Sequence, residues 1–174
     1  MSKASANRLR VLAIDPSFRG FGFAVVEGPE RLIDWGVKNM KQDKNTSCLT
    51  KIDKLIEHYQ PEMIVIEDAI GKNSRRRLRV RQLIQQVVLL ARRKKIKHRS
   101  FSRSTIQKTF SQGDVPTKHQ IATIITKQFP ELSRHLPRFR KAWMTEDWRM
   151  SIFNAMALAI TFFCASRPKN ERPA

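Results

Sequence analysis

The stretch RVLAIDPSFRG, residues 10–20, sets the architecture, because it reads as a buried strand that ends in a carboxylate and runs straight into a turn. After Gly20 the apolar pattern resumes over residues 21–26, and a second turn at residues 27–30 leads to a third strand over residues 32–37. Three strands joined by short turns predict an antiparallel meander.

A second acidic strand follows an amphipathic helix, which is predicted over residues 49–59 and ends before Pro61. The segment MIVIED, residues 63–68, begins as a continuous apolar run, which is typical of a central strand covered on both faces. It ends in Glu67 and Asp68. Two strands therefore end in acids, at the edge of the sheet where ligand sites form in α/β proteins.

Paired carboxylates at such an edge indicate a site for hard divalent cations such as magnesium, which prefer oxygen ligands. Two such ions can clamp the attacking and leaving oxygens of a phosphodiester displacement. A strand-end Asp followed by a proline is also a common turn cap, and this alternative stays open for Asp15.

The rest of the chain predicts helices and one short strand. Residues 130–145 contain prolines and many cations, which favours an exposed loop. The length of 174 residues suits one domain, predicted over residues 9–166, with flexible ends at residues 1–8 and 167–174. The expected elements are a helix over residues 76–94, a strand over 96–101, a helix from Ser102 or Ser104 to Phe110, a helix that opens at Thr117, and a buried helix from Asp147 or Trp148 to Cys164.

The charge of the chain predicts a polyanionic partner. Lysine and arginine total 34 against 15 acids, a net charge of +19, and residues 69–113 contain no Asp or Glu. A merely solvated face usually mixes both signs, and a membrane-bound surface would need an amphipathic helix with a bulky aromatic face. Nucleic acid is the favoured partner. Its predicted contacts are Lys72, Asn73, Arg75, Arg76, Arg77, Arg79, Arg81, Arg103 and Lys108.

Cysteine usage and the N-terminus favour an intracellular protein. Cys48 and Cys164 lie far apart without a metal-type spacing, which fits a reducing compartment. The N-terminal residues lack a signal-peptide core, and no apolar run is long enough to cross a membrane. We expect a cytoplasmic, nucleoid-associated protein with no membrane partner and no small-molecule cofactor.

The motifs occur in an order that resembles the RuvC-family Holliday junction resolvases. The strand ending in Asp15, with the Gly20-Phe21-Gly22 run after it, resembles the first hairpin of that family. Residues 64–67, 71–73, 103–120 and 154–161 resemble its second acidic strand, the loop after it, its basic segment and its closing helix. The resemblance implies an α/β, RNase H-like fold. Its five-stranded mixed sheet, an antiparallel three-strand meander plus parallel strands, would be flanked by helices. The resemblance also implies a homodimer and magnesium-dependent cutting of four-way DNA junctions.

Positions that match the family's motifs carry its site residues over to this chain. Asp15 and Glu67 match the first two metal-binding acids, and Lys118 matches a basic residue near the scissile phosphate. Such a lysine would stabilise charge developing on the phosphate, although a surface lysine is the alternative. A second basic position falls at Gln107, with Lys108 beside it, and Ile70 stands near the family's aromatic wedge.

The closing helix departs from the family, which has two aspartates there, one turn apart. Those positions are Ser151 and Asn154 in this chain. Asp147 precedes Asn154 by seven residues, nearly two helical turns, so both would share one face. Asp147 could be the third acid, with Asn154 a neutral oxygen ligand. Asn154 could also be an engineered replacement of Asp, or the site could have decayed. Asp147 could also be only a helix cap.

The leading functional prediction is a structure-selective endonuclease for branched DNA. Asp15, Glu67, Asp147 and Asn154 are its expected ligands for two Mg²⁺ or Mn²⁺ ions. A non-catalytic nucleic-acid-binding module on the same fold is the second hypothesis, favoured by Ser151 and Asn154. A transposase-type enzyme is the third, although the chain is short for the extra DNA-binding domains that such enzymes carry.

Overall fold

The computed structural model describes residues 8–69 and 76–167, and its centre is a five-stranded sheet in the order β3-β2-β1-β4-β5. The expected α/β fold with a mixed sheet is confirmed, because the first three strands form an antiparallel meander and the last two run parallel to β1. The strands are β1 (Arg10–Pro16), β2 (Gly20–Glu27), β3 (Leu32–Asn39), β4 (Met63–Glu67) and β5 (Lys97–Phe101).

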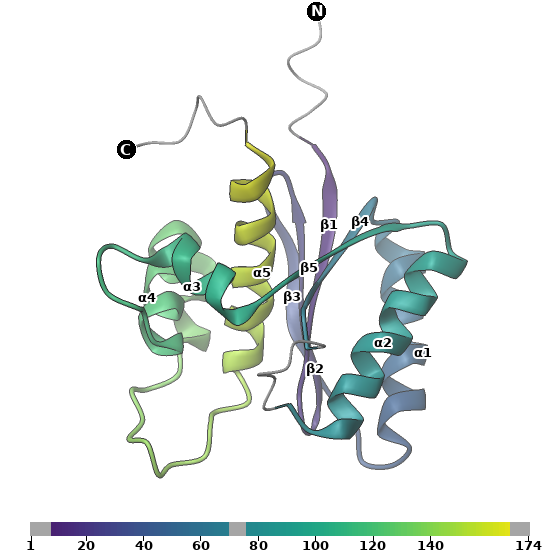
Figure 1. Cartoon of the computed structure of the whole chain (residues 1–174), viewed down its shortest axis with the longest axis horizontal. Coiled ribbons are helices and arrows are strands. Elements are labelled where there is room, and N and C mark those ends of the chain that lie inside the picture. The colour runs from purple at the N-terminus through teal and green to yellow at the C-terminus, as the bar shows by residue number, and fades with distance from the viewer. Residues whose placement is uncertain (1–7, 70–75, 168–174) are drawn as a thin grey trace, which may run out of the picture.

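Helices cover both faces of this sheet (Figure 1). One face carries α1 and α2, and the other carries α5 with α3 and α4 packed around it (Figure 1). Ser102, one of the two predicted starts, caps α3, and Thr117, where the next helix was predicted to open, caps α4 and forms a reciprocal capping box with Gln120. The helices are α1 (Lys44–Tyr59), α2 (Leu78–Arg93), α3 (Arg103–Phe110), α4 (Lys118–Gln128) and α5 (Met150–Ser166), with a 3₁₀ helix at Pro130–His135.

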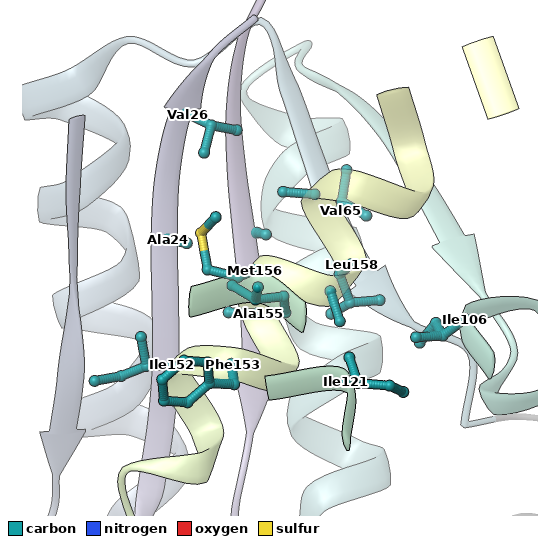
Figure 2. Close-up of a cluster of buried hydrophobic side chains, with 14 of the residues drawn as sticks. Ala24, Val26, Val65, Ile106, Ile121, Ile152, Phe153, Ala155, Met156 and Leu158 are labelled. Atoms are coloured by element: carbon teal, nitrogen blue, oxygen red, sulfur yellow. The ribbon is translucent and has the colours of Figure 1, made fainter. Parts of the chain in front are cut away.

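Two hydrophobic cores lie on the two faces, and the central strand β1 supplies both. Its side chains alternate, so Val11 and Ala13 enter the core under α5, while Leu12 and Ile14 enter the core under α1 and α2. All four are fully buried. Figure 2 shows the first core, where α5 places its apolar side chains against Ala24, Val26 and Val65 of the sheet. This two-sided burial explains the apolar runs in β1 and β4.

Three predicted elements have other bounds in the structure. Helix α1 begins at Lys44, earlier than residue 49, because its first turn is polar and carries no apolar periodicity. Residues 130–135 form a 3₁₀ helix that buries Leu132, so only the rest of the expected loop is irregular. Helix α5 begins at Met150, after Asp147 and Trp148, and continues to Ser166.

The predicted flexible ends, residues 1–8 and 167–174, fall almost entirely outside the described residues. Within the described part of the chain, no helix combines the length and apolarity that a membrane crossing requires.

Candidate active site

Asp15 and Glu67 meet at the carboxyl ends of two neighbouring strands. Ile14 of β1 is paired with Ile66 of the parallel strand β4, so the two acids follow side by side. Asp15 is only 2% exposed, and Glu67 is the last residue of its strand and mostly buried. The register of the sheet therefore brings together the two acids that the sequence predicts as a pair.

A single guanidinium bridges the two acids. Arg76, just before α2, donates from Nη2 to Oδ1 of Asp15 at 3.0 Å and from the same nitrogen to Oε2 of Glu67. Its Nη1 donates to the carbonyl of Pro16 at 2.6 Å. Burial alone would lower the pKa of Arg76, but the charges of Asp15 and Glu67 outweigh it and raise that pKa. The two acids thus share one cation.

Helix α5 closes the site with two neutral donors. Ser151 donates from Oγ to Oδ2 of Asp15 at 2.8 Å, and Asn154, one turn later, donates from Nδ2 to the same oxygen at 3.1 Å. The approach of this helix depends on Gly22, which lies opposite Asp15 in β2. A Cβ at Gly22 would come within 2.4 Å of the Ser151 hydroxyl, so a larger residue would push α5 away.

The donor set of this site fits a divalent metal ion in part. Two carboxylates that converge on one cation supply the oxygen ligands that Mg²⁺ and Mn²⁺ prefer. However, residues 8–69 and 76–167 contain no group of three or more His, Cys, Asp or Glu side chains placed to hold a metal ion. Glu67 and Asp15 are therefore a pair of acids, with Ser151 and Asn154 as their polar neighbours.

Asp147 occupies a different position from the one that the helical spacing predicts. Because α5 begins at Met150, Asp147 precedes the helix and does not continue its face. Its Oδ1 accepts from the backbone N–H of Arg149 at 2.9 Å, and its Oδ2 accepts from the Arg149 side chain at 2.6 Å. The side-chain hydrogen bond from Arg149 is the main cause that lowers the pKa of Asp147. These contacts form a turn ahead of α5, whose N-cap is Arg149 without a side-chain cap, so the alternative of Asp147 as the helix cap is wrong.

The predicted basic residues divide into two groups. Lys118 begins α4 and forms an ion pair with Glu146 at 2.8 Å. Arg103 begins α3. Burial lowers its pKa, although the negative charges of Glu67, Asp15 and Glu146 act to raise it. The charges that act on Arg103 place it near the acidic edge, whereas the contact of Lys118 is with Glu146, in the segment before α5. Arg81 and Lys108 are exposed on α2 and α3, whereas Ile70, Gly71, Lys72, Asn73 and Arg75 lie outside the described residues.

The turn after Asp15 contains an exposed aromatic that the sequence analysis missed. The Phe18 ring is 54% exposed, with the Lys44 ammonium 4.3 Å and the Arg77 guanidinium 4.4 Å from its centroid. Arg79, whose contact with nucleic acid stays a prediction, donates to the backbone carbonyls of Ser17 and Phe18 at 2.8 and 2.7 Å. The contacts of Arg77 and Arg79 connect residues about sixty positions apart, and that of Lys44 spans twenty-six, so no local pattern could reveal them.

This strand order, with helices on both faces of the sheet, is that of the RNase H-like fold. The chain itself belongs to the RuvC family, because the family model described as crossover junction endodeoxyribonuclease RuvC matches residues 11–138. That range contains Asp15, Glu67 and Lys118 and ends before α5, so the departures at Ser151 and Asn154 lie beyond it.

Individual relatives agree with this assignment. The curated crossover junction endodeoxyribonuclease RuvC of Akkermansia muciniphila is 36% identical over 70 residues, which cover 36% of this chain and 42% of the relative's length. The structure of Thermus thermophilus RuvC in complex with Holliday junction substrate matches with a TM-score of 0.65 at 14% identity, covering 90% of this chain and 94% of that one. The yeast mitochondrial Holliday junction resolvase Ydc2 matches with a TM-score of 0.62 at 16% identity, covering 88% and 77%. At these identities the structural matches establish the fold.

Proposed function

We propose that this protein is a structure-selective endonuclease that cuts branched DNA, as Holliday junction resolvases do. The observation that carries the proposal is the pair Asp15 and Glu67, which converge on one cationic group at the sheet edge of a RuvC-family chain. The net charge of +19 supports a polyanionic substrate. A structural relative crystallised with Holliday junction substrate supports the branched form of that substrate.

The metal would be Mg²⁺ or Mn²⁺, two ions by the family resemblance, held by Asp15 and Glu67. When bound, it would supply an activated water and charge stabilisation for phosphodiester hydrolysis. Asn154 remains our candidate for a neutral oxygen ligand, after its amide turns away from Asp15. Asp147 would contribute only if its ion pair with Arg149 opened.

The cations of the chain have two proposed tasks. Arg76 holds Asp15 and Glu67 together without metal, and it would move to a DNA phosphate when a divalent ion takes its place. Lys118, released from Glu146, would stabilise charge on the scissile phosphate. The exposed residues Arg77, Arg81 and Lys108, together with Arg103, would contact backbone phosphates and so recognise shape rather than sequence. Lys72, Asn73 and Arg75 are kept as predicted contacts.

A non-catalytic module that binds branched DNA is the second candidate. It is favoured by Ser151 and Asn154, which donate hydrogen bonds to Asp15 where the family has two further acids. Such a site carries fewer negative charges to attract metal ions. This candidate predicts the same DNA selectivity with no metal-dependent cutting. Association with the nucleoid stays part of the proposal, since either candidate would act on cellular DNA.

The predicted homodimer has a candidate surface on α2. Leu78 and Leu89 are large exposed apolar side chains of this helix. They are eleven residues apart, about three helical turns, so they lie on one face. A second copy of the chain could cover that face.

Binding to matched DNAs tests the proposed function. A labelled four-way junction and a linear duplex of the same length are titrated with protein at several salt concentrations, and cutting is followed after Mg²⁺ is added. We expect tighter binding to the junction, affinity that falls steeply with salt, and cutting near the branch that stops with chelator. Equal affinity for the two DNAs, or affinity that does not depend on salt, would contradict the proposal.

A further inference from the structure

The segment before α5 gathers exposed aromatic and sulfur-containing side chains. Phe139 and Trp143 are 74% and 79% exposed, and Met144 and Trp148 are also largely exposed. Burying such side chains would be favourable, and they gather within ten residues. Cations alternate with them, at Arg138, Arg140, Lys141 and Arg149.

A cavity of about 580 Å³ lies between this segment and the start of α4. We name it the aromatic pocket; its lining includes Phe139, Met144, Met150, Lys118 and Arg138. This volume is within the usual range for a small-molecule-sized site. The ring of Phe139 is held edge-on against His119, with 5.6 Å between ring centroids. The pocket therefore combines a positioned aromatic wall with cations at its rim.

The acids of the pocket do not oppose an anionic ligand, because each is paired. Glu146 accepts from Lys118 at 2.8 and 3.0 Å, and Asp147 accepts from Arg149 at 2.6 Å. Arg140 also lies 4.0 Å from Glu146, so the charge balance belongs to the lining as a whole. Its four cations, Lys118, Arg138, Arg140 and Arg149, outnumber the two acids, and this excess favours a negatively charged group at the pocket.

The aromatic pocket adjoins the acidic pair. Met150 lines it, and the next residue, Ser151, donates to Asp15. The pKa of Arg103 is lowered by burial, and the charges of Glu67, Asp15 and Glu146 oppose this effect. Glu146 lines the pocket, so Arg103 lies between the pocket and the acidic pair. Figure 1 shows the loop before α5 at the same end of the molecule as the start of α2. A nucleic acid whose phosphate reached Asp15 would therefore pass the pocket.

We propose that the aromatic pocket binds an unpaired nucleobase, with the adjacent phosphate on the cations at its rim. Aromatic side chains bind bases by stacking, and enclosed pockets accept bases extruded from a duplex. Trp143, with the Lys141 ammonium 5.1 Å from its ring centroid, offers a second stacking surface beside the pocket. The inference rests on the proposed function, since a branch point presents unpaired or weakly stacked bases.

The test compares two labelled single strands of equal length and charge, an oligothymidylate and an abasic strand. The variants are Phe139→Ala combined with Trp143→Ala, and Val115→Ala as a matched control. Val115 is also an apolar side chain, 73% exposed, and lies outside the pocket lining. We expect the wild type and the control to bind the oligothymidylate about tenfold or more tightly than the abasic strand. The double variant should lose that preference and keep its affinity for the abasic strand.

Three results would overturn the pocket proposal. The double variant could keep its preference for bases, or lose affinity equally for both strands, which would indicate phosphate contacts only. It could also show weaker self-association in sedimentation with unchanged base preference, which would assign the surface to a second copy of the chain. A parallel titration with junction and duplex distinguishes failure of the pocket proposal from failure of the proposed function. If the wild type does not prefer the junction, the proposed function fails while the strand comparison still decides the pocket.

Discussion

Replacing Asn154 with Asp tests how the acidic site depends on its neutral neighbours. The Asn154 amide donates to Oδ2 of Asp15 at 3.1 Å, and Asp15 is buried. Asn154→Asp removes a hydrogen bond to a charged group, about 1.5–3 kcal/mol. It also places a second negative charge close to the first, and such charges about 4 Å apart repel by about 4 kcal/mol at an effective dielectric of 20.

Arg76 offsets part of this repulsion, because its guanidinium binds the other oxygen of Asp15. We therefore expect Asn154→Asp to lower the free energy of unfolding by about 2–4 kcal/mol in the presence of chelator. A divalent cation should reverse the effect, because the new carboxylate becomes a third acidic ligand. A cation at about a hundredfold its dissociation constant would return about 2.7 kcal/mol.

The assay is urea denaturation with and without Mg²⁺, followed by circular dichroism and accompanied by a junction-cutting assay. The control is Asn154→Ala, which removes the same hydrogen bond without adding a charge. We expect metal to stabilise Asn154→Asp much more than the control, and cutting to rise above that of the wild type. The reasoning is refuted if Asn154→Asp is as stable as the wild type in chelator and gains no more from Mg²⁺ than the control.

Three further predictions follow from other contacts. Arg76→Ala should lower stability in chelator and increase the stabilisation by Mg²⁺, because the acids lose their cation; equal Mg²⁺ responses of variant and wild type in thermal denaturation would count against this. Burial, and then the hydrogen bond and charge of Asp34, raise the pKa of Tyr59 to about 12 from about 10. The resulting stability is complete below about pH 10 and is lost as the pH rises toward 12. Tyr59 is the only tyrosine, so phenolate absorbance should report its midpoint, and Asp34→Asn should lower it; a wild-type midpoint near 10 would disprove the contact. Leu89→Asp should weaken self-association in sedimentation by placing a charge on the apolar face shared with Leu78, and an unchanged dimer would exclude that face.

The sheet and the acidic pair could be predicted because their signals are local. Each strand is a short apolar run bounded by turn residues, and Asp15 and Glu67 end two such runs. Parallel pairing of β1 with β4 then brings the acids together without further information. The sequence could also predict the cap at Thr117, because that residue and Gln120 form a short-range motif.

The cation that bridges the acids and the place of Asp147 could not be predicted, because they depend on contacts and on a helix start that the local pattern does not show. Arg76 looks like a phosphate contact in an acid-free segment, yet it reaches Asp15 from sixty-one positions away. The shared face of Asp147 and Asn154 assumed a continuous helix. Instead, the Asp147 carboxylate binds Arg149. The backbone N–H groups of residues 150–152 each donate to the carbonyl three residues earlier, a tighter turn than that of an α-helix.

Cutting of a four-way junction by acid variants tests the central claim most directly. Wild type, Asp15→Asn and Glu67→Gln are incubated with the same labelled junction and Mg²⁺, at protein concentrations where a binding assay shows the DNA fully bound. We predict that the wild type cuts near the branch, while both variants bind the junction and leave it uncut. Cutting by either variant at the wild-type rate would contradict the assignment of Asp15 and Glu67 as the metal-binding pair.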